Sequence, residues 1–153
     1  MRQNGPEKLD YKKEVFSYLD RHTRPDVVLA SSSSGMPASQ FIADCQVNPS
    51  RILIGHPFNP PHLIPLVEIV PHASTSLDVV DRARELYAAL GKKPVVVSRE
   101  CPGFLANRLQ AALVHEAYSL VIRGIATASD IGMHAFPSHF AALELTSSRR
   151  RSE

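Results

Sequence analysis

The sequence predicts an α/β fold, because short apolar runs alternate along the chain with segments of helical period. The apolar runs lie at residues 27–30, 52–55, 66–70 and 94–97. The first run has no polar alternation, which is typical of a parallel strand covered on both faces. The chain has 153 residues, of which 44% are hydrophobic, so its size and composition are those of an ordinary globular domain.

The first two helices are predicted at residues 6–22 and 37–45. Pro6 suits the first turn of a helix, where its missing N–H costs nothing. Three apolar side chains then fall on one stripe among charged neighbours, namely Leu9, Phe16 and Leu19. Pro37 opens the second predicted helix after the serine-rich turn at residues 31–35.

A third helix is predicted to follow Thr75 or Ser76, either of which can cap it, and to end at Gly91. A long apolar helix is predicted from about residue 102 to 124, and residues 127–130 are typical of the capped start of one more. Residues 132–153 keep no helical or strand period, so we expect them to form an irregular tail.

Charge and cysteine content exclude several classes of protein. Lys and Arg number 17 against 15 Asp and Glu, a net charge of +2, so the chain has no electrostatic signature of a nucleic-acid partner or an anionic membrane. Cys45 and Cys101 form no C-x-x-C motif, which favours a reducing compartment. The polar start of the chain leads into no apolar segment, and we expect a cytoplasmic protein that spans no membrane.

Two further classes of site are excluded by spacing. The closest two of the 7 glycines are eight residues apart, so no G-x-G-x-x-G turn or P-loop can form. His115 and Glu116 begin like a zinc-protease helix, but Ser119 stands where the second histidine ligand is required. We therefore predict no metal site.

Four polar residues are candidates for chemistry. His56 and Glu68 lie twelve residues apart at the junctions of two consecutive predicted strands, which a proline-stiffened loop joins, and adjacent strands would bring them together. A carboxylate that accepts a ring N–H fixes the histidine tautomer and raises its basicity, as a general base needs. A structural contact between the two side chains is equally open. Ser34 and Asn107 lie next to predicted helix starts, so each can be a cap or a substrate ligand.

Four ordered motifs carry a family resemblance. They are LASSSS at residues 29–34, GHPFNPP at 55–61, PLVEIV at 65–70 and PGFLANRL at 102–109. In order and nearly in spacing they resemble the signatures of the 3-hydroxyacyl-CoA dehydrogenase family, from about Gln3 to Ile131. The histidine motif, without an aromatic directly after the histidine, is more similar to the branch of lambda-crystallin (L-gulonate 3-dehydrogenase) and carnitine dehydrogenase than to the acyl-CoA enzymes.

The resemblance implies an NAD-dependent oxidoreductase that oxidises the 3-hydroxyl of a hydroxy acid or hydroxyacyl-CoA to a ketone. By position, His56 matches the catalytic base and Glu68 the carboxylate that orients it. Ser34 and Asn107 match the groups that hold the substrate oxygen. Lys8, together with Ser34, matches a contact to the NAD cofactor, although Gln3 stands where a glutamate is usual.

The resemblance also implies an organisation in parts. Residues 1–98 would be the C-terminal part of a Rossmann-like doubly wound domain without its Gly-rich first half, and residues 99–131 the first helix of an all-α domain. We expect such a chain alone to be inactive or nearly so. The alternative is a non-catalytic assembly module that pairs with a full-length paralogue, because the strand at 27–30 would have one open edge. A homo-oligomer is also possible.

Overall fold

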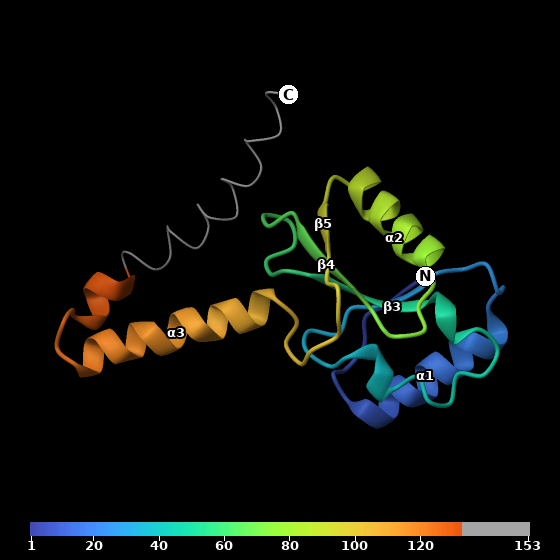
Figure 1. Cartoon of the computed structure of the whole chain (residues 1–153), viewed down its shortest axis with the longest axis horizontal. Helices are drawn as coiled ribbons and strands as arrows, with labels where there is room; N and C mark the ends of the chain where they lie inside the picture. The colour runs from blue at the N-terminus through green and yellow to red at the C-terminus, as the bar shows by residue number, and fades with distance from the viewer. Residues whose placement is uncertain (133–153) are drawn as a thin grey trace. The chain divides into compact units, whose positions relative to one another are not determined.

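The computed structural model describes residues 1–132, so the irregular tail predicted at 132–153 lies outside the described residues except for Gly132. The chain divides into two compact units, Met1–Asn107 and Arg108–Glu153. The first unit is a sheet with helix α1 (Leu9–His22) on one face and helix α2 (Leu77–Ala89) on the other (Figure 1). The predicted α/β class is therefore confirmed, whereas the domain limits at 98 and 131 stay a prediction.

The first unit contains a five-stranded mixed sheet in the order β1-β2-β3-β4-β5. The strands are β1 (Arg2–Gln3), β2 (Leu29–Ser31), β3 (Ile52–Pro57), β4 (Leu66–Pro71) and β5 (Lys93–Val96). Strands β1, β2 and β3 are parallel, β4 is antiparallel to β3, and β5 is parallel to β4. The loop between β3 and β4 is shorter than the crossover of about a dozen residues that parallel strands require, so the chain turns back.

The two faces of the sheet bury separate apolar clusters. Alternate residues of the strands point to opposite faces, so Ile52 and Ile54 belong to one cluster and Leu53 to the other. Phe16 of α1 (Leu9–His22) packs in the first cluster, and Tyr87 of α2 (Leu77–Ala89) in the second. Coverage of both faces explains why β2 and β3 carry no polar alternation.

The edge of the sheet differs from the sequence prediction. Strand β1, which the sequence did not predict, pairs with β2 through Arg2 opposite Ala30 and Gln3 opposite Ser31. Two residues are too short to carry a period, which explains the miss. Because β2 also pairs with β3, the prediction of an open edge at residues 27–30 was wrong.

The helix predicted at residues 37–45 was also wrong. The structure has only a 3-10 turn there, Ala38–Gln40. Phe41 and Cys45 are buried in the same apolar cluster as Ala38, so the segment follows the packing of these side chains rather than a helical period. This compact connection leads from the serine-rich turn to β3.

The ends of α1 and α2 follow the predicted signals in part. Helix α1 begins at Leu9, after Lys8 at the cap position. Helix α2 follows Ser76, whose side chain makes no capping hydrogen bond. Gly91 has φ of 74° and its N–H donates to the Ala88 carbonyl oxygen at 2.9 Å, so the predicted left-handed end of α2 is confirmed.

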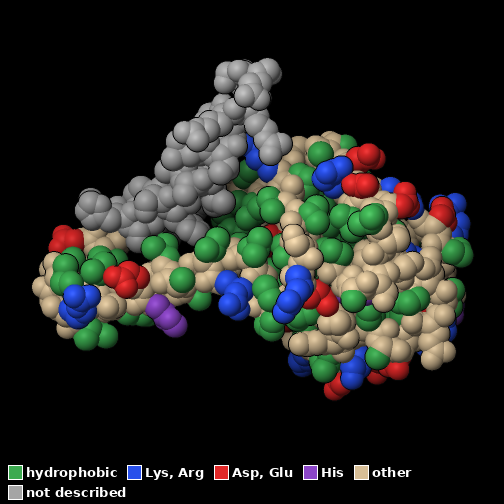
Figure 2. Space-filling model, in the orientation of Figure 1, with side chains coloured by type: hydrophobic (Ala, Val, Ile, Leu, Met, Phe, Trp, Pro, Cys, Tyr) green, Lys and Arg blue, Asp and Glu red, His purple; other side chains and the backbone are tan. Residues whose placement is uncertain are grey.

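The described part of the second unit contains most of helix α3 (Ala106–Ile122) and the turn that follows it. Hydrophobic side chains lie along its surface in Figure 2, and Leu109, Tyr118 and Ile122 are 69%, 65% and 84% exposed. Thr127 and Asp130 exchange hydrogen bonds as a capping box, as predicted. No helix of residues 1–132 is long and apolar enough to cross a membrane.

Candidate functional site

His56 and Glu68 form a buried pair in the middle of the sheet. They lie directly opposite each other in the antiparallel register of β3 and β4. The distance from His56 Nδ1 to Glu68 Oε2 is 2.9 Å. His56 is 5% exposed and Glu68 1% exposed, so water competes little for this hydrogen bond. The proximity expected from the sequence is therefore present.

The second carboxylate oxygen of Glu68 binds the start of α3. Oε1 accepts hydrogen bonds from the backbone N–H groups of Leu105 and Ala106, each at 2.9 Å. Burial by itself raises the pKa of Glu68, but the hydrogen bond from His56 and those from the two backbone N–H groups together outweigh it. They hold the pKa of Glu68 below its ordinary value, so the carboxylate is ionised at neutral pH.

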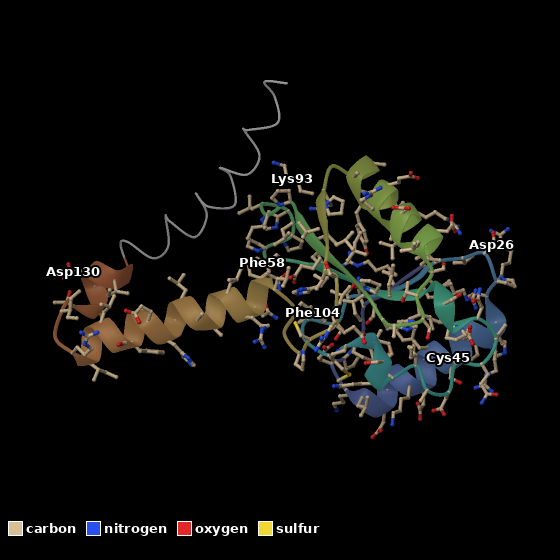
Figure 3. The ribbon with its side chains drawn as sticks, viewed as in Figure 1. Asp26, Cys45, Phe58, Lys93, Phe104 and Asp130 are labelled. Atoms are coloured by element: carbon tan, nitrogen blue, oxygen red, sulfur yellow. The ribbon has the colours of Figure 1, made fainter. Side chains whose placement is uncertain are left out.

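This contact determines which nitrogen of His56 is available. An ionised carboxylate only accepts hydrogen bonds, so Nδ1 of neutral His56 carries the proton and Nε2 keeps a lone pair. Within residues 1–132, Nε2 has no hydrogen-bond partner. The His56 ring centroid lies 5.6 Å from that of Phe104 and 6.3 Å from that of Phe58, both labelled in Figure 3. A histidine held in this way by a carboxylate has the chemistry that a general base requires.

A tight turn before α3 brings Asn107 to Ser34. The N–H of Phe104 donates to the Cys101 carbonyl oxygen across Pro102 and Gly103, whose φ of 77° is that of a type II turn. Asn107 Nδ2 donates to the backbone oxygen of Ser34 at 2.5 Å. The Ser34 side chain is exposed. The structure thus joins two predicted site residues through the backbone of one and the side chain of the other.

The sequence analysis missed a charged pair beside the serine-rich turn. Lys12 is 1% exposed, and its Nζ lies 3.1 Å from Glu7 Oε2 and 3.3 Å from Ser31 Oγ. Glu7 Oε1 accepts hydrogen bonds from Ser33 Oγ and the Ser34 N–H. Burial raises the pKa of Glu7, but hydrogen bonds from Ser33 and Lys12 and the charge of Lys12 bring it below its ordinary value. The sequence did contain a sign of this pair, because Lys12 falls on the apolar stripe of α1, where a charged side chain needs a partner.

Lys8, the predicted cofactor contact, is exposed at the cap position of α1. Its backbone oxygen accepts a hydrogen bond from the N–H of Lys12 at 3.0 Å. The structure joins it to neither the His56–Glu68 pair nor Ser34 by a hydrogen bond.

Two other kinds of site were considered in the described residues. In residues 1–132 no group of His, Cys, Asp and Glu side chains is arranged to hold a metal ion. A groove of about 960 Å³ lies along the outer face of α1, lined by charged side chains that include Asp10 and Arg21. None of the predicted site residues lines this groove, so we do not assign it to the site.

Comparison with known proteins decides the family. Residues 3–101 match the family model of the 3-hydroxyacyl-CoA dehydrogenase NAD-binding domain. The chain belongs to this family. It is 54% identical over 131 residues to a 3-hydroxyacyl-CoA dehydrogenase of Gibberella moniliformis and 45% identical over 131 residues to an L-carnitine dehydrogenase of Streptomyces griseus. Both alignments cover 86% of this chain, so the resemblance seen in the motifs is confirmed.

A solved structure supports the fold. The crystal structure of 5-formyl-3-hydroxy-2-methylpyridine 4-carboxylic acid 5-dehydrogenase, an NAD⁺-dependent dismutase, superposes with a TM-score of 0.79 and 35% identity. The match covers 86% of this chain and 42% of that one. The chain likewise spans 41% and 39% of the lengths of the two curated relatives.

NAD is the cofactor of this family's domain. In open α/β sheets, ligands lie outside the carboxyl ends of the parallel strands. Glu7, Lys8 and Ser34 follow the ends of β1 and β2 in the chain, and these charged and hydroxyl side chains are of a kind that can hydrogen-bond to a polar cofactor. Residues 1–132 contain no turn with two close glycines that would bring backbone N–H groups to the pyrophosphate.

Proposed function

We propose that this chain supplies the catalytic dyad of an NAD-dependent oxidoreductase that oxidises the 3-hydroxyl of a hydroxy acid or hydroxyacyl-CoA to a ketone. The observation that carries the proposal is the 2.9 Å hydrogen bond between His56 Nδ1 and Glu68 Oε2. It gives a buried histidine whose second nitrogen is free to take a proton. Family membership supplies the class of reaction.

The proposed role of His56 is to remove the hydroxyl proton of the substrate through Nε2. When NAD is bound, it supplies the acceptor for the hydride. Glu68 keeps its negative charge beside the ring and stabilises the imidazolium that forms. A positioned general base of this kind contributes about 10²–10⁴-fold to the rate.

Ser34 and Asn107 are proposed to hold the substrate oxygen beside His56. Their support is the hydrogen bond from Asn107 Nδ2 to the Ser34 backbone oxygen, which ties the two residues together. Lys8 and Ser34 are proposed to contact the cofactor, since both are exposed beyond the ends of β1 and β2. The Glu7–Lys12 pair would hold the serine-rich turn in place, because Glu7 accepts hydrogen bonds from Ser33 and Ser34.

The names of the relatives suggest substrates to test. A 3-hydroxyacyl-CoA and L-carnitine are the substrates named by the two curated relatives above. Both are small molecules, and we propose this class of secondary alcohol as the substrate.

The test of His56 compares two histidine variants in a whole enzyme. We suggest replacing the matched 131 residues of the Gibberella moniliformis relative with those of this chain and measuring NADH formation with both substrates. His56→Gln should lower kcat by about 10²–10⁴-fold. His62→Gln, a change at an exposed loop position, is the matched control and should leave kcat unchanged. Unchanged turnover in His56→Gln would rule out His56 as the base.

A binding experiment tests the cofactor part of the proposal separately. Because no two glycines of the chain are close enough for a phosphate-binding turn, we expect it to bind NADH only weakly by itself. A fluorescence titration with NADH measures this. Micromolar affinity would contradict the view that the chain lacks the pyrophosphate part of the cofactor site.

The alternative of a non-catalytic assembly module has lost the argument that motivated it. Strand β2 has parallel neighbours on both sides, so no open edge exists at residues 27–30. Size-exclusion chromatography tests the alternative, which requires the chain to associate rather than elute as a stable monomer.

A further inference from the structure

We propose that Gly103 and Phe104 are positioning residues for the His56–Glu68 pair, an inference that rests on the proposed function. They would act through the two backbone N–H groups that follow them, which bind Glu68, and through the Phe104 ring, which packs against His56. Neither residue is proposed to touch substrate or cofactor.

The backbone of these two residues is unusual. Gly103 has φ of 77° and Phe104 has φ of 50°, the one non-glycine residue with positive φ among residues 1–132. A phenylalanine in this region is strained, because its Cβ crowds the following carbonyl oxygen. Such strain persists where surrounding contacts over-determine the conformation, and it concentrates at functional sites. Phe104 is fully buried, which provides those contacts.

The two positive φ angles determine where the next N–H groups point. Leu105 and Ala106 both donate to Oε1 of Glu68, each at 2.9 Å. Successive backbone N–H groups that converge in this way form an anion-binding nest. Since Oε1 is held by the nest, Oε2 is left facing Nδ1 of His56 at 2.9 Å. The turn therefore fixes the rotation of the carboxylate.

The Phe104 side chain acts on the other member of the pair. Its ring is tilted by 57° to that of His56, with centroids 5.6 Å apart. Phe58 lies near the His56 ring in an edge contact at 6.3 Å. Aromatic neighbours at these distances restrict rotation of the imidazole. One strained residue thus orients both the base and, through the backbone, the carboxylate.

The turn is also fixed from its other side. The N–H of Gly103 donates to the Gly35 carbonyl oxygen at 3.0 Å, and the Cys101 thiol lies 3.4 Å from the Phe104 carbonyl oxygen. The first of these bonds holds the turn against the segment that contains Ser34, and the second closes the turn on itself. A substitution at Gly103 should therefore disturb the hydrogen bonds to Glu68 more than it disturbs the rest of the sheet.

The test compares two glycines with the same backbone conformation in the full chain. Gly103→Ala and Gly91→Ala each force alanine into a left-handed position, since φ is 77° at Gly103 and 74° at Gly91. Both variants should lose thermal stability. The pKa of the Glu68 carboxyl, measured by ¹³C NMR, should rise towards its ordinary value in Gly103→Ala only. An equal pKa in the two variants would overturn the proposal.

A measurement on the unaltered chain decides the matter if Gly103→Ala does not fold. The amide ¹H shifts of Leu105 and Ala106 should titrate together with the Glu68 carboxyl carbon, with one shared midpoint below the ordinary value of a glutamate. Amides that do not follow Glu68 would overturn the proposal. Neither experiment measures turnover, so an inactive protein whose amides follow Glu68 would contradict the proposed function and leave the positioning role intact.

Discussion

Two buried carboxylates, Asp20 and Glu68, each hydrogen-bond to a nitrogen-bearing side chain, Arg51 and His56 respectively. Each carboxylate accepts hydrogen bonds from two successive backbone N–H groups as well as from its partner side chain. The distance from Arg51 Nη2 to Asp20 Oδ1 is 3.2 Å, and Asp20 and Arg51 are 0% and 1% exposed. Glu68 and His56 are buried to a similar degree. Burial and hydrogen bonding alone therefore do not separate a structural pair from the pair that we propose to be catalytic.

The two pairs differ in the side chain that binds the carboxylate, which is Arg51 in one and His56 in the other. The terminal nitrogens of Arg51 donate to the backbone oxygens of Asp20, Thr23 and Arg24 at the end of α1, and so join this helix to the start of β3. His56 instead uses one ring nitrogen for Glu68 and leaves the other without a partner in residues 1–132. A guanidinium also stays protonated at any ordinary pH, whereas an imidazole exchanges its proton near neutrality. Of the two pairs, only the second leaves a ring nitrogen with a lone pair for the proposed proton transfer.

The largest effect is expected from breaking the structural pair. Arg51→Met leaves the buried Asp20 charge without its cation, and we expect the free energy of unfolding to fall by about 3–5 kcal/mol. Arg24→Met, which removes an exposed ion pair with Asp26, is the control and should cost no more than about 1 kcal/mol. Denaturant unfolding measures both. Equal losses in the two variants would show that Asp20–Arg51 is not the structural pair described above.

The loss of unfolding free energy at alkaline pH should depend on Cys45, which lies near Asp20. Burial, with the negative charges of Asp20 and Asp44, raises the pKa of Cys45 from 9.0 to about 11. A thiol that ionises later in the folded state contributes stability that is complete below pH 9.0 and is lost as pH rises to about 11. Cys45→Ala should therefore lose less stability than the unaltered chain over this interval. Identical slopes of unfolding free energy against pH would contradict the assignment.

The loss of unfolding free energy at acid pH should depend on Glu68, and we expect this effect to be smaller than that of Cys45. The pKa of Glu68 is lowered in the folded state from its ordinary value of 4.5. A carboxylate of this kind contributes stability above its unfolded pKa, and that contribution is lost as pH falls below 4.5 through the folded value. Glu68→Gln should have a shallower acid limb in urea unfolding measured across this interval. An unchanged limb would mean that Glu68 is not ionised more readily in the folded chain.

The sequence could predict the elements whose signal is local and long enough to repeat. The apolar runs of β2 to β5 and the helix end at Gly91 belong to this group. His56 and Glu68 could be placed together because they lie on consecutive strands, β3 and β4, and the loop between these strands is short. These features need no knowledge of distant packing.

Other features depend on partners far along the chain. Strand β1 has only two residues, and only its pairing with β2 defines it. The helix predicted at residues 37–45 does not form, because the burial of Phe41 and Cys45 determines the path of this segment. The hydrogen bonds from the N–H groups of Leu105 and Ala106 to Glu68 join residues more than 30 positions apart, so no local sequence pattern predicts them. The roles of Ser34, Asn107 and Lys8 stay predictions.

The tautomer of His56 tests the central claim most directly. Long-range ¹⁵N NMR of the neutral ring should show the proton on Nδ1 in the unaltered chain, because the ionised Glu68 can only accept. In Glu68→Gln the side-chain oxygen must still face the two N–H groups of the nest, so the amide nitrogen faces His56 and donates to Nδ1. We predict that the proton then moves to Nε2. A proton on Nε2 in the unaltered chain, or the same tautomer in both proteins, would contradict a base oriented by Glu68.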